Sequence, residues 1–135
     1  MAGLYLDTSA VLRAVLEQGT TPDLERRIEQ APVLVTSRLS QVEASRALHR
    51  LRQQGGAPEA GLADAERQME LVWQRCELWE ISRSVCELAR QVAPASILRA
   101  LDAIHLATFV LARRRIGGLE LLSADQRLQD AASTV

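Results

Sequence analysis

The 135-residue sequence contains no lysine, and all 16 of its basic residues are arginines. The missing lysine excludes every mechanism that needs one, including phosphate chemistry in which a lysine contacts the transferring group. Because 17 acidic residues bring the formal net charge to -1, the chain also lacks the general positive charge of a strongly basic nucleic-acid coat. Contact with phosphate would have to come from a local group of arginines.

Other common signals are also missing. The two cysteines, Cys76 and Cys86, lack CxxC spacing and a neighbouring histidine, so no zinc site with His49 and His105 is expected and the thiols are expected to be structural. No apolar run approaches the roughly 20 residues of a membrane span. No basic stretch followed by a long apolar run opens the chain, so a cytoplasmic location without membrane association is expected. No GxxxxGK[ST] or GxGxxG motif supports a nucleotide-binding loop.

Length and composition are those of one globular domain, residues 1–135. Short apolar segments alternate with helical patterns along it. Strands are expected at residues 4–6, 33–35, 77–81 and 119–122, and helices at 10–17, from 22, at 36–54, 59–73, 82–94, 100–115 and 126–132. Strands alternating with helices predict an α/β fold with a mainly parallel central sheet flanked by helices.

Two aspartates follow predicted strands. Asp7 comes directly after the first strand, and Asp125 lies three residues beyond the last. In a parallel sheet both would lie at carboxyl ends of strands, where ligand crevices form in open α/β sheets. Each is equally suited to cap the helix that follows it, so the sequence leaves both roles open.

Asp102 opens the most apolar predicted helix, residues 100–115, which is expected to be buried. A carboxylate there can cap the helix or interact with its dipole, but an ionised group at the apolar inner edge is costly without a cation. His105 lies one turn further on, and a packed, hydrogen-bonded histidine is favoured over a catalytic one. Arg113-Arg114-Arg115 complements the dipole at the far end, with RNA contact as the alternative.

Glu43 has a specific competing explanation, because Ser40 to Glu43 matches the S-x-x-E capping box. The better helix start lies at residues 36–37, which would place Glu43 inside the helix at the margin of its buried arc. Arg46 and Arg50 share roughly that face. Their simplest interpretation is a solvated surface with a weak ion pair to Glu43.

Together the four carboxylates of Asp7, Glu43, Asp102 and Asp125 suit a hard divalent cation, which prefers oxygen ligands and keeps several waters. Without a cation, clustered carboxylates repel one another. A bound Mg²⁺ polarises a phosphoryl oxygen and activates water for in-line attack, so no nucleophilic side chain is required. If folding brings these residues together, the site is that of a metal-dependent hydrolase.

Four segments that contain these acids, YLDTSA, SQVEASRAL, LRALDAIHLAT and LLSADQRLQDAA, resemble the PIN-domain ribonucleases, specifically the VapC-type toxins of bacterial type II toxin-antitoxin pairs. The resemblance covers nearly the whole chain in the right order. It implies a single PIN domain with four to five strands and an acidic pocket. It also implies an endoribonuclease that hydrolyses RNA phosphodiester bonds with Mg²⁺, with Mn²⁺ as a possible substitute.

The resemblance also assigns roles and partners. It makes Asp7 and Asp102 the principal metal ligands, Glu43 a ligand or the support of one, and Asp125 a ligand or a water-orienting group, with hydrogen bonds from Thr8 or Ser9. It further implies a homodimer and a cognate VapB-type antitoxin whose tail blocks the pocket. Relatives continue into a short fifth strand where this chain has Ser133-Thr134-Val135, which puts that strand in doubt.

Three alternatives compete with this hypothesis. Receiver and dehalogenase-type phosphotransfer domains place aspartates similarly but depend on a lysine, so they are excluded. A catalytically silent PIN-like domain that binds RNA or protein has no need for carboxylates that repel phosphate. A plain interaction protein requires four coincidental caps or surface acids.

Overall fold

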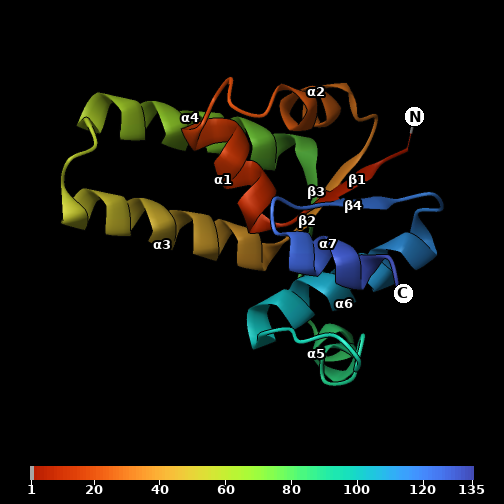
Figure 1. Cartoon of the computed structure of the whole chain (residues 1–135). Helices are drawn as coiled ribbons and strands as arrows, with labels where there is room; N and C mark the ends of the chain where they lie inside the picture. Colours follow the sequence, from red (N-terminus) through yellow and green to blue (C-terminus); the bar gives the residue numbers. More distant parts are fainter. Residues whose placement is uncertain (1) are drawn as a thin grey trace.

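The computed structural model of the chain describes residues 2–135 and has an α/β fold (Figure 1). Its strands are β1 (Leu4–Leu6), β2 (Leu34–Ser37), β3 (Cys76–Trp79) and β4 (Glu120–Leu122). Its helices are α1 (Thr8–Leu16), α2 (Pro22–Gln30), α3 (Arg38–Gln54), α4 (Glu59–Arg75), α5 (Arg83–Ala89), α6 (Ala100–Arg115) and α7 (Gln126–Ala132). The strands form a parallel sheet in the order β3-β2-β1-β4, which confirms the predicted fold class.

Alternating strand side chains build a separate core on each face of the sheet. Leu4 and Leu6 of β1 belong to a core shared with α1, α2, α3 and α4, whereas Tyr5 belongs to a core shared with α6 and α7. This alternation follows from the geometry of a strand, in which successive residues point to opposite faces. Helices therefore cover both faces, and β1 is buried at the centre of the sheet.

Helices α3 and α4 form an antiparallel pair that extends past the sheet (Figure 1). The glycines between them adopt positive φ angles, 70° at Gly55 and 89° at Gly56, which only glycine tolerates readily. Arg52 of α3 joins the helices through ion pairs of 3.1 Å to Glu59 and 3.0 Å to Glu66. These links keep α3 and α4 together, and one long face of α3 remains exposed to solvent.

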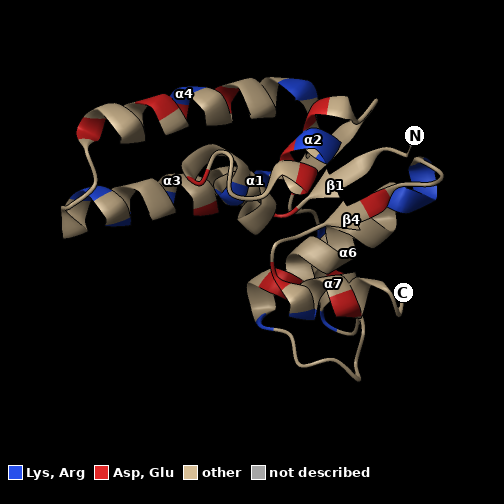
Figure 2. Ribbon diagram, turned by 45° about the horizontal axis from the view of Figure 1, so that its top comes forward, with Lys and Arg blue, Asp and Glu red and all other residues tan. Residues whose placement is uncertain are grey.

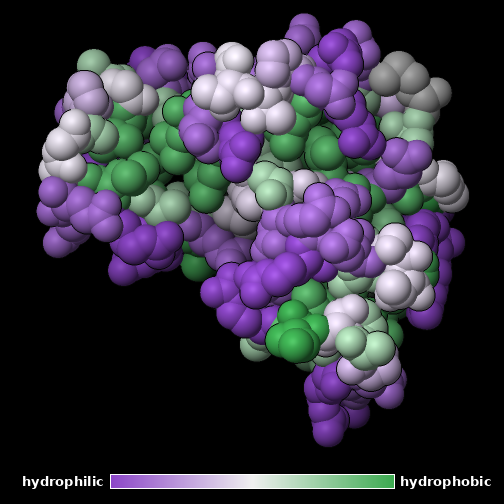
Figure 3. All heavy atoms as spheres, in the orientation of Figure 1, coloured by the Kyte–Doolittle hydropathy of each residue, from purple (hydrophilic) through white to green (hydrophobic). Residues whose placement is uncertain are grey.

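An apolar cavity of about 460 Å³ lies where α1 meets this helix pair. It is lined by Leu12, Val15, Leu16, Glu17, Leu51, Ala57, Pro58, Gly61 and Leu62. Figure 3 shows hydrophobic surface between the two helices, framed by hydrophilic side chains. Packing of α1 against the pair therefore leaves apolar surface uncovered.

The start of α3 differs from the capping-box interpretation. Thr36 and Ser37 extend β2 by pairing with β3, opposite Leu78 and Trp79. The Ser37 hydroxyl then accepts a hydrogen bond from the Leu39 amide at 3.0 Å and caps the helix. The favoured helix start at residues 36–37 is therefore confirmed, and the competing capping box at residues 40–43 is excluded, because that segment already lies inside the helix.

Two other expectations are corrected. The helix predicted to end near Pro94 ends at Ala89, and Ala93 has a φ of 46° just before Pro94, whose ring disfavours helical geometry in the preceding residue. Helix α6 has the predicted bounds, but only its central part is buried, since Leu101 in its first turn is 47% exposed.

The carboxyl end adds no strand: residues 133–135 follow α7 as a turn, so the sheet built from residues 2–135 has four strands. Both cysteines are free. None of the helices in the described part of the chain is long and apolar enough to cross a membrane.

Candidate active site

All four predicted acids line one cavity of about 220 Å³ at the carboxyl edge of the sheet. Asp7 follows β1, Glu43 lies in α3, Asp102 in the first turn of α6, and Asp125 between β4 and α7. The cavity forms where the first turn of α1, the middle of α3 and the start of α6 meet, with Asp125 added from the start of α7. The fold therefore brings together carboxylates that are up to 118 residues apart in the sequence, from residue 7 to residue 125.

Asp7 is the deepest of these acids, with only 4% of its surface exposed. Its Oδ1 accepts hydrogen bonds from the Ala10 amide at 3.0 Å and the Ser9 hydroxyl at 2.8 Å, and its Oδ2 accepts one from Ser123 at 2.7 Å. Burial raises the pKa of Asp7, although these hydrogen bonds oppose the shift. Asp7 thus caps α1 and lines the cavity, so its interpretation as a helix cap and its interpretation as a site residue are compatible.

The other three acids lie nearer the surface, with 21% to 27% of their side chains exposed. Asp125 also lines the cavity and caps a helix at the same time, because its Oδ1 accepts a hydrogen bond from the Arg127 amide of α7 at 2.9 Å. Asp102 does not cap α6, since Arg99 occupies the cap position without a side-chain hydrogen bond. Instead Asp102 lies 3.6 Å from the Arg99 guanidinium, and its carboxylate faces the cavity.

Glu43 is held by two residues of the opposite wall. Its Oε1 lies 2.7 Å from Nε2 of His105 and 2.6 Å from the Thr8 hydroxyl. Burial alone would raise the pKa of Glu43, but the hydrogen bonds from His105 and Thr8 outweigh it and leave that pKa lowered. Glu43 is therefore kept as an anion with a fixed orientation.

His105 continues this network into the core. The ring is buried, and its Nδ1 lies 2.9 Å from the hydroxyl of Tyr5. Burial raises the pKa of Tyr5, so this phenol stays protonated and can donate to Nδ1 while Nε2 donates to Glu43. The favoured interpretation of His105 as a packed, hydrogen-bonded side chain is confirmed. No sequence signal pointed to Tyr5, because its partner is 100 residues away.

Two hydroxyls position Asp7 and Asp125. Ser9, expected to support the site, donates to Asp7 and accepts from the Ala124 amide at 2.9 Å. Ser123, which the sequence marked only as part of a turn, donates to Asp7 and accepts from the Asp125 amide at 2.9 Å. Serine at the end of β4 was a weak signal, since its role depends on β1 and β4 being neighbours.

Arginines also reach the cavity. Arg50 and Arg99 both line it, so the sequence-based interpretation of Arg50 as solvated surface is incomplete. The Arg113-Arg114-Arg115 cluster lies at the other end of α6, roughly 18 Å along the helix axis from Asp102, and does not line the cavity. Arg113 and Arg115 instead lie over the rings of Phe109 and Trp79, at 4.9 and 5.6 Å.

The donors in this cavity fit a hard divalent cation, because they are carboxylate oxygens and hydroxyls. Within residues 2–135, no three Asp, Glu, His or Cys side chains converge tightly enough to hold a metal ion by themselves. Mg²⁺ usually keeps several waters and binds one or two carboxylates together with substrate phosphates. An open set of acids therefore suits such an ion better than a closed structural zinc site.

Comparison with known proteins agrees with this geometry. Residues 4–133 match the PIN domain family. The chain is 32% identical over its full length to the ribonuclease VapC46 of Mycobacterium tuberculosis, covering 94% of that protein. VapC20 of the same organism, a toxin that cleaves the sarcin-ricin loop, has the same fold, with a TM-score of 0.67 at 16% identity over 96% of this chain and 95% of that one. A toxin-antitoxin complex from Klebsiella pneumoniae aligns with a TM-score of 0.64 at 20% identity over 93% and 88%. The chain therefore belongs to the PIN-domain family, in its VapC type.

Proposed function

We propose that this protein is the toxin of a type II toxin-antitoxin pair and acts as a metal-dependent endoribonuclease that hydrolyses RNA phosphodiester bonds. The observation that carries the proposal is the gathering of four acids from four distant segments around one cavity. Relatives similar along the whole chain are named ribonucleases. A single PIN domain then accounts for residues 1–135, and an RNA substrate is consistent with a cytoplasmic location.

In this proposal Asp7 and Asp102 are the principal ligands of Mg²⁺, for which Mn²⁺ can substitute, with Glu43 and Asp125 as further ligands or supports. When bound, such an ion supplies Lewis acidity toward the phosphodiester and offsets the negative charge of acids and substrate. The protein's own contribution is orientation. Ser9 and Ser123 hold the Asp7 carboxylate, and His105 holds that of Glu43.

Asp125 has a distinct position, because its cap bond to the Arg127 amide uses Oδ1. Oδ2 accepts no hydrogen bond from the residues that the structure describes, so it is available to orient a water molecule. A carboxylate in this position can act as a general base or position the attacking water.

The alternative is a catalytically silent PIN-like domain that binds RNA or protein. The buried, desolvated Asp7 favours the enzyme, because a binding role gains nothing from a carboxylate that is costly to bury. Carboxylates beside a phosphate-binding surface also weaken phosphate binding unless a cation offsets them.

Cleavage of total RNA by the purified protein, with and without Mg²⁺, tests the proposal. We expect Mg²⁺-dependent fragments with 5′-phosphates, lost in Asp7→Asn and Asp102→Asn. Asp64→Asn is the matched control, because Asp64 lies on α4 outside the cavity. Absence of cleavage with either Mg²⁺ or Mn²⁺, or equal cleavage by all variants, would contradict the enzymatic function.

The partners are proposed on the same basis. A cognate VapB-type antitoxin is expected to bind and block the cavity, and two copies of the chain are expected to form a homodimer. Co-expression with the product of an adjacent small reading frame should give a stable complex that does not cut RNA. Size-exclusion chromatography with light scattering measures whether the free protein is dimeric, and a monomer at micromolar concentration would contradict the homodimer.

A further inference from the structure

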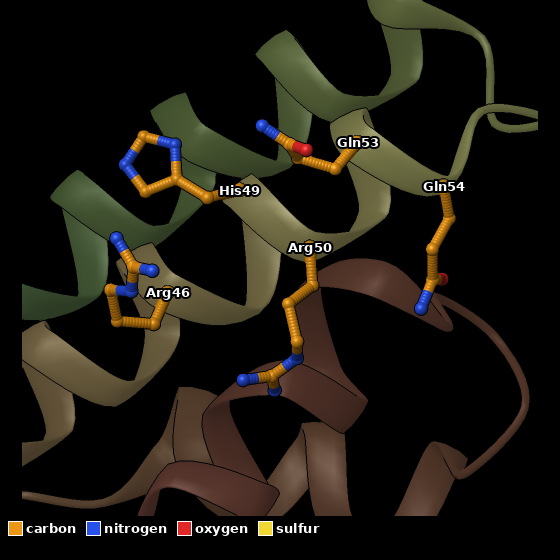
Figure 4. Close-up of a pocket in the computed structure, with 5 residues that line it drawn as sticks. All are labelled: Arg46, His49, Arg50, Gln53 and Gln54. Carbon is orange, nitrogen blue, oxygen red and sulfur yellow. The ribbon is translucent and has the colours of Figure 1, made fainter.

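A groove of about 490 Å³ runs along the exposed face of α3 and is lined by Arg46, His49, Arg50, Gln53 and Gln54. Figure 4 shows these side chains projecting from successive turns, with Arg50 and Gln54 on one side of the helix and His49 and Gln53 on the other. Residues four apart on a helix lie above one another, so the groove follows the helix axis. Its lining contains two guanidinium groups and two amides but no acid.

Arg50 connects this groove to the catalytic cavity, since it lines both. Glu43 at the cavity and Gln54 at the far end of the groove are eleven residues apart on the same helix, a rise of roughly 16 Å. One continuous path therefore leads from the four acids to the end of α3.

The arginines of the groove differ from the other arginines of α3. Arg38 pairs with Glu80, and Arg52 pairs with Glu59 and Glu66. In contrast, Arg46 and Arg50 form no hydrogen bond or ion pair with any residue between 2 and 135, and the weak ion pair expected with Glu43 is absent there. Their donors are free to bind an anion from outside.

The two helices of the pair also differ in the charges that they carry. Helix α3 carries four arginines and one glutamate, whereas α4 carries four acids and two arginines. In Figure 2 the bands on α3 are mainly blue, whereas α4 carries red bands together with blue ones. Because the whole chain has a net charge of -1, the α3 face is a local positive surface rather than part of a general basic coat.

An RNA strand that is to be cleaved at the acidic cavity needs a positive surface beside it. The four carboxylates repel the phosphates that must approach them, so binding energy has to come from contacts outside the acidic cavity. Guanidinium groups bind phosphate with paired hydrogen bonds, and amides and imidazoles can bond to phosphate, sugar or base edges.

We infer that the groove formed by Arg46, His49, Arg50, Gln53 and Gln54 binds the backbone of single-stranded RNA next to the scissile phosphate and leads it into the cavity. Arg50 contacts a phosphate at the cavity entrance, and Arg46 contacts a neighbouring one. The inference rests on the proposed RNA-cleaving function but concerns binding, which can be measured without cleavage.

The test measures binding of a fluorescein-labelled, single-stranded RNA of mixed sequence by fluorescence anisotropy, in EDTA, over a series of salt concentrations. The variant is Arg46→Gln with Arg50→Gln. The matched control is Arg67→Gln with Arg83→Gln, which removes the same charge from exposed positions on α4 and α5. Circular dichroism melting verifies that each variant is folded.

We expect the groove variant to bind RNA roughly tenfold more weakly at low salt, as loss of charge-assisted hydrogen bonds predicts. The slope of log K against log salt should become less steep by about 1.4, because each phosphate contact on a single strand contributes about 0.7. The control should keep the affinity and slope of the wild type. In the cleavage assay Arg46→Gln alone should raise KM more than it lowers kcat, since Arg46 lies outside the cavity.

Equal affinity and slope in the wild type and the groove variant would overturn the inference, whether or not the protein cuts RNA. Tighter binding of labelled polyglutamate than of RNA, lost in the same variant, would also overturn it and assign the groove to an acidic protein segment. If the groove variant loses RNA binding but no metal supports cleavage, the groove stands and the nuclease function fails. If the groove variant loses RNA binding while Asp102→Asn abolishes cleavage and keeps the wild-type salt slope, both stand.

Discussion

Nε2 of His105 lies 2.7 Å from Oε1 of Glu43, and this contact joins α6 to α3 across the acidic cavity. The ring is 3% exposed and the carboxylate about a quarter exposed, so the hydrogen bond is partly protected from water. A second hydrogen bond, from the Tyr5 hydroxyl to the other ring nitrogen, fixes the ring. The position of Glu43 is therefore set from inside the core, and this relationship can be measured.

We expect a double-mutant cycle with His105→Leu and Glu43→Gln to give a coupling free energy of about 1.5 to 2 kcal/mol at neutral pH, the lower part of the range for hydrogen bonds to charged groups. The pKa of Glu43 is lowered in the folded protein, so its stabilisation is present above the ordinary glutamate pKa and is lost as the pH falls through the lowered value. Urea unfolding at several pH values measures the coupling free energy and its dependence on pH. A coupling within about 0.3 kcal/mol of zero at neutral pH would show that the contact is not formed.

Ser123→Ala tests the hydroxyl that joins Asp7 to the start of α7. The substitution removes a donor from the buried Asp7 carboxylate and an acceptor from the Asp125 amide, so we expect a loss of about 1 to 3 kcal/mol in the free energy of unfolding. RNA cleavage should fall as well, because Asp7 loses its orientation.

Ser133→Ala is the matched control for Ser123→Ala. The Ser133 hydroxyl makes one exposed hydrogen bond, to the Asp130 carbonyl, so the change should stay within about 0.5 kcal/mol. Equal destabilisation by the two substitutions would contradict the structural role of Ser123.

Asp7→Asn should stabilise the metal-free protein while abolishing cleavage. Burial raises the pKa of Asp7, so ionisation of this group destabilises the folded state as the pH rises from the ordinary aspartate pKa to above the raised value. Asparagine removes that cost and remains a good helix cap. The expected gain is on the order of 1 kcal/mol at neutral pH in EDTA, and it should vanish in acid, where Asp7 is protonated.

Added Mg²⁺ or Mn²⁺ should make the wild type more stable than Asp7→Asn, the reverse of their order without metal. A ligand that binds only the folded state raises its stability, so the metal should raise the Tm of the wild type but not that of Asp7→Asn. Differential scanning fluorimetry measures this without RNA. Asp64→Asn, with a partly exposed carboxylate paired to Arg67, should respond to metal as the wild type does. An Asp7→Asn protein that gains as much Tm from metal as the wild type would remove Asp7 from the ligands.

The two cysteines should differ in reactivity. Burial raises the pKa of Cys76 to about 12, which leaves almost no thiolate near neutral pH, whereas Cys86 is exposed. Iodoacetamide at mildly alkaline pH should therefore alkylate Cys86 quickly and Cys76 only after unfolding, as measured by mass spectrometry. Cys86→Ser should abolish the fast reaction, and fast labelling of that variant would contradict the burial of Cys76.

Elements with strong local patterns were predictable from the sequence alone. Helix α6 was predicted with its observed bounds, since a long apolar segment and the three arginines after it are followed by Gly117-Gly118, which disfavours further helix. Helix α5 was predicted too long, because the sequence signal was Pro94, which only limits how far a helix can continue, whereas α5 ends five residues earlier, at Ala89. The favoured start of α3 at residues 36–37 was confirmed, since Ser37 caps the helix, and this excludes the competing capping box at Ser40 to Glu43.

The residue types of the site, four acids next to apolar segments, were present in the sequence and indicate metal-ion chemistry, while the absence of lysine excludes lysine-dependent chemistry. Their shared cavity, the Tyr5–His105–Glu43 network, and the position of Arg50 between acids and groove depend on the order β3-β2-β1-β4 and on helix packing. The physical reason is that composition and periodicity act over a few residues. Contacts between residues 5 and 105, or 9 and 123, exist only after the sheet has been assembled.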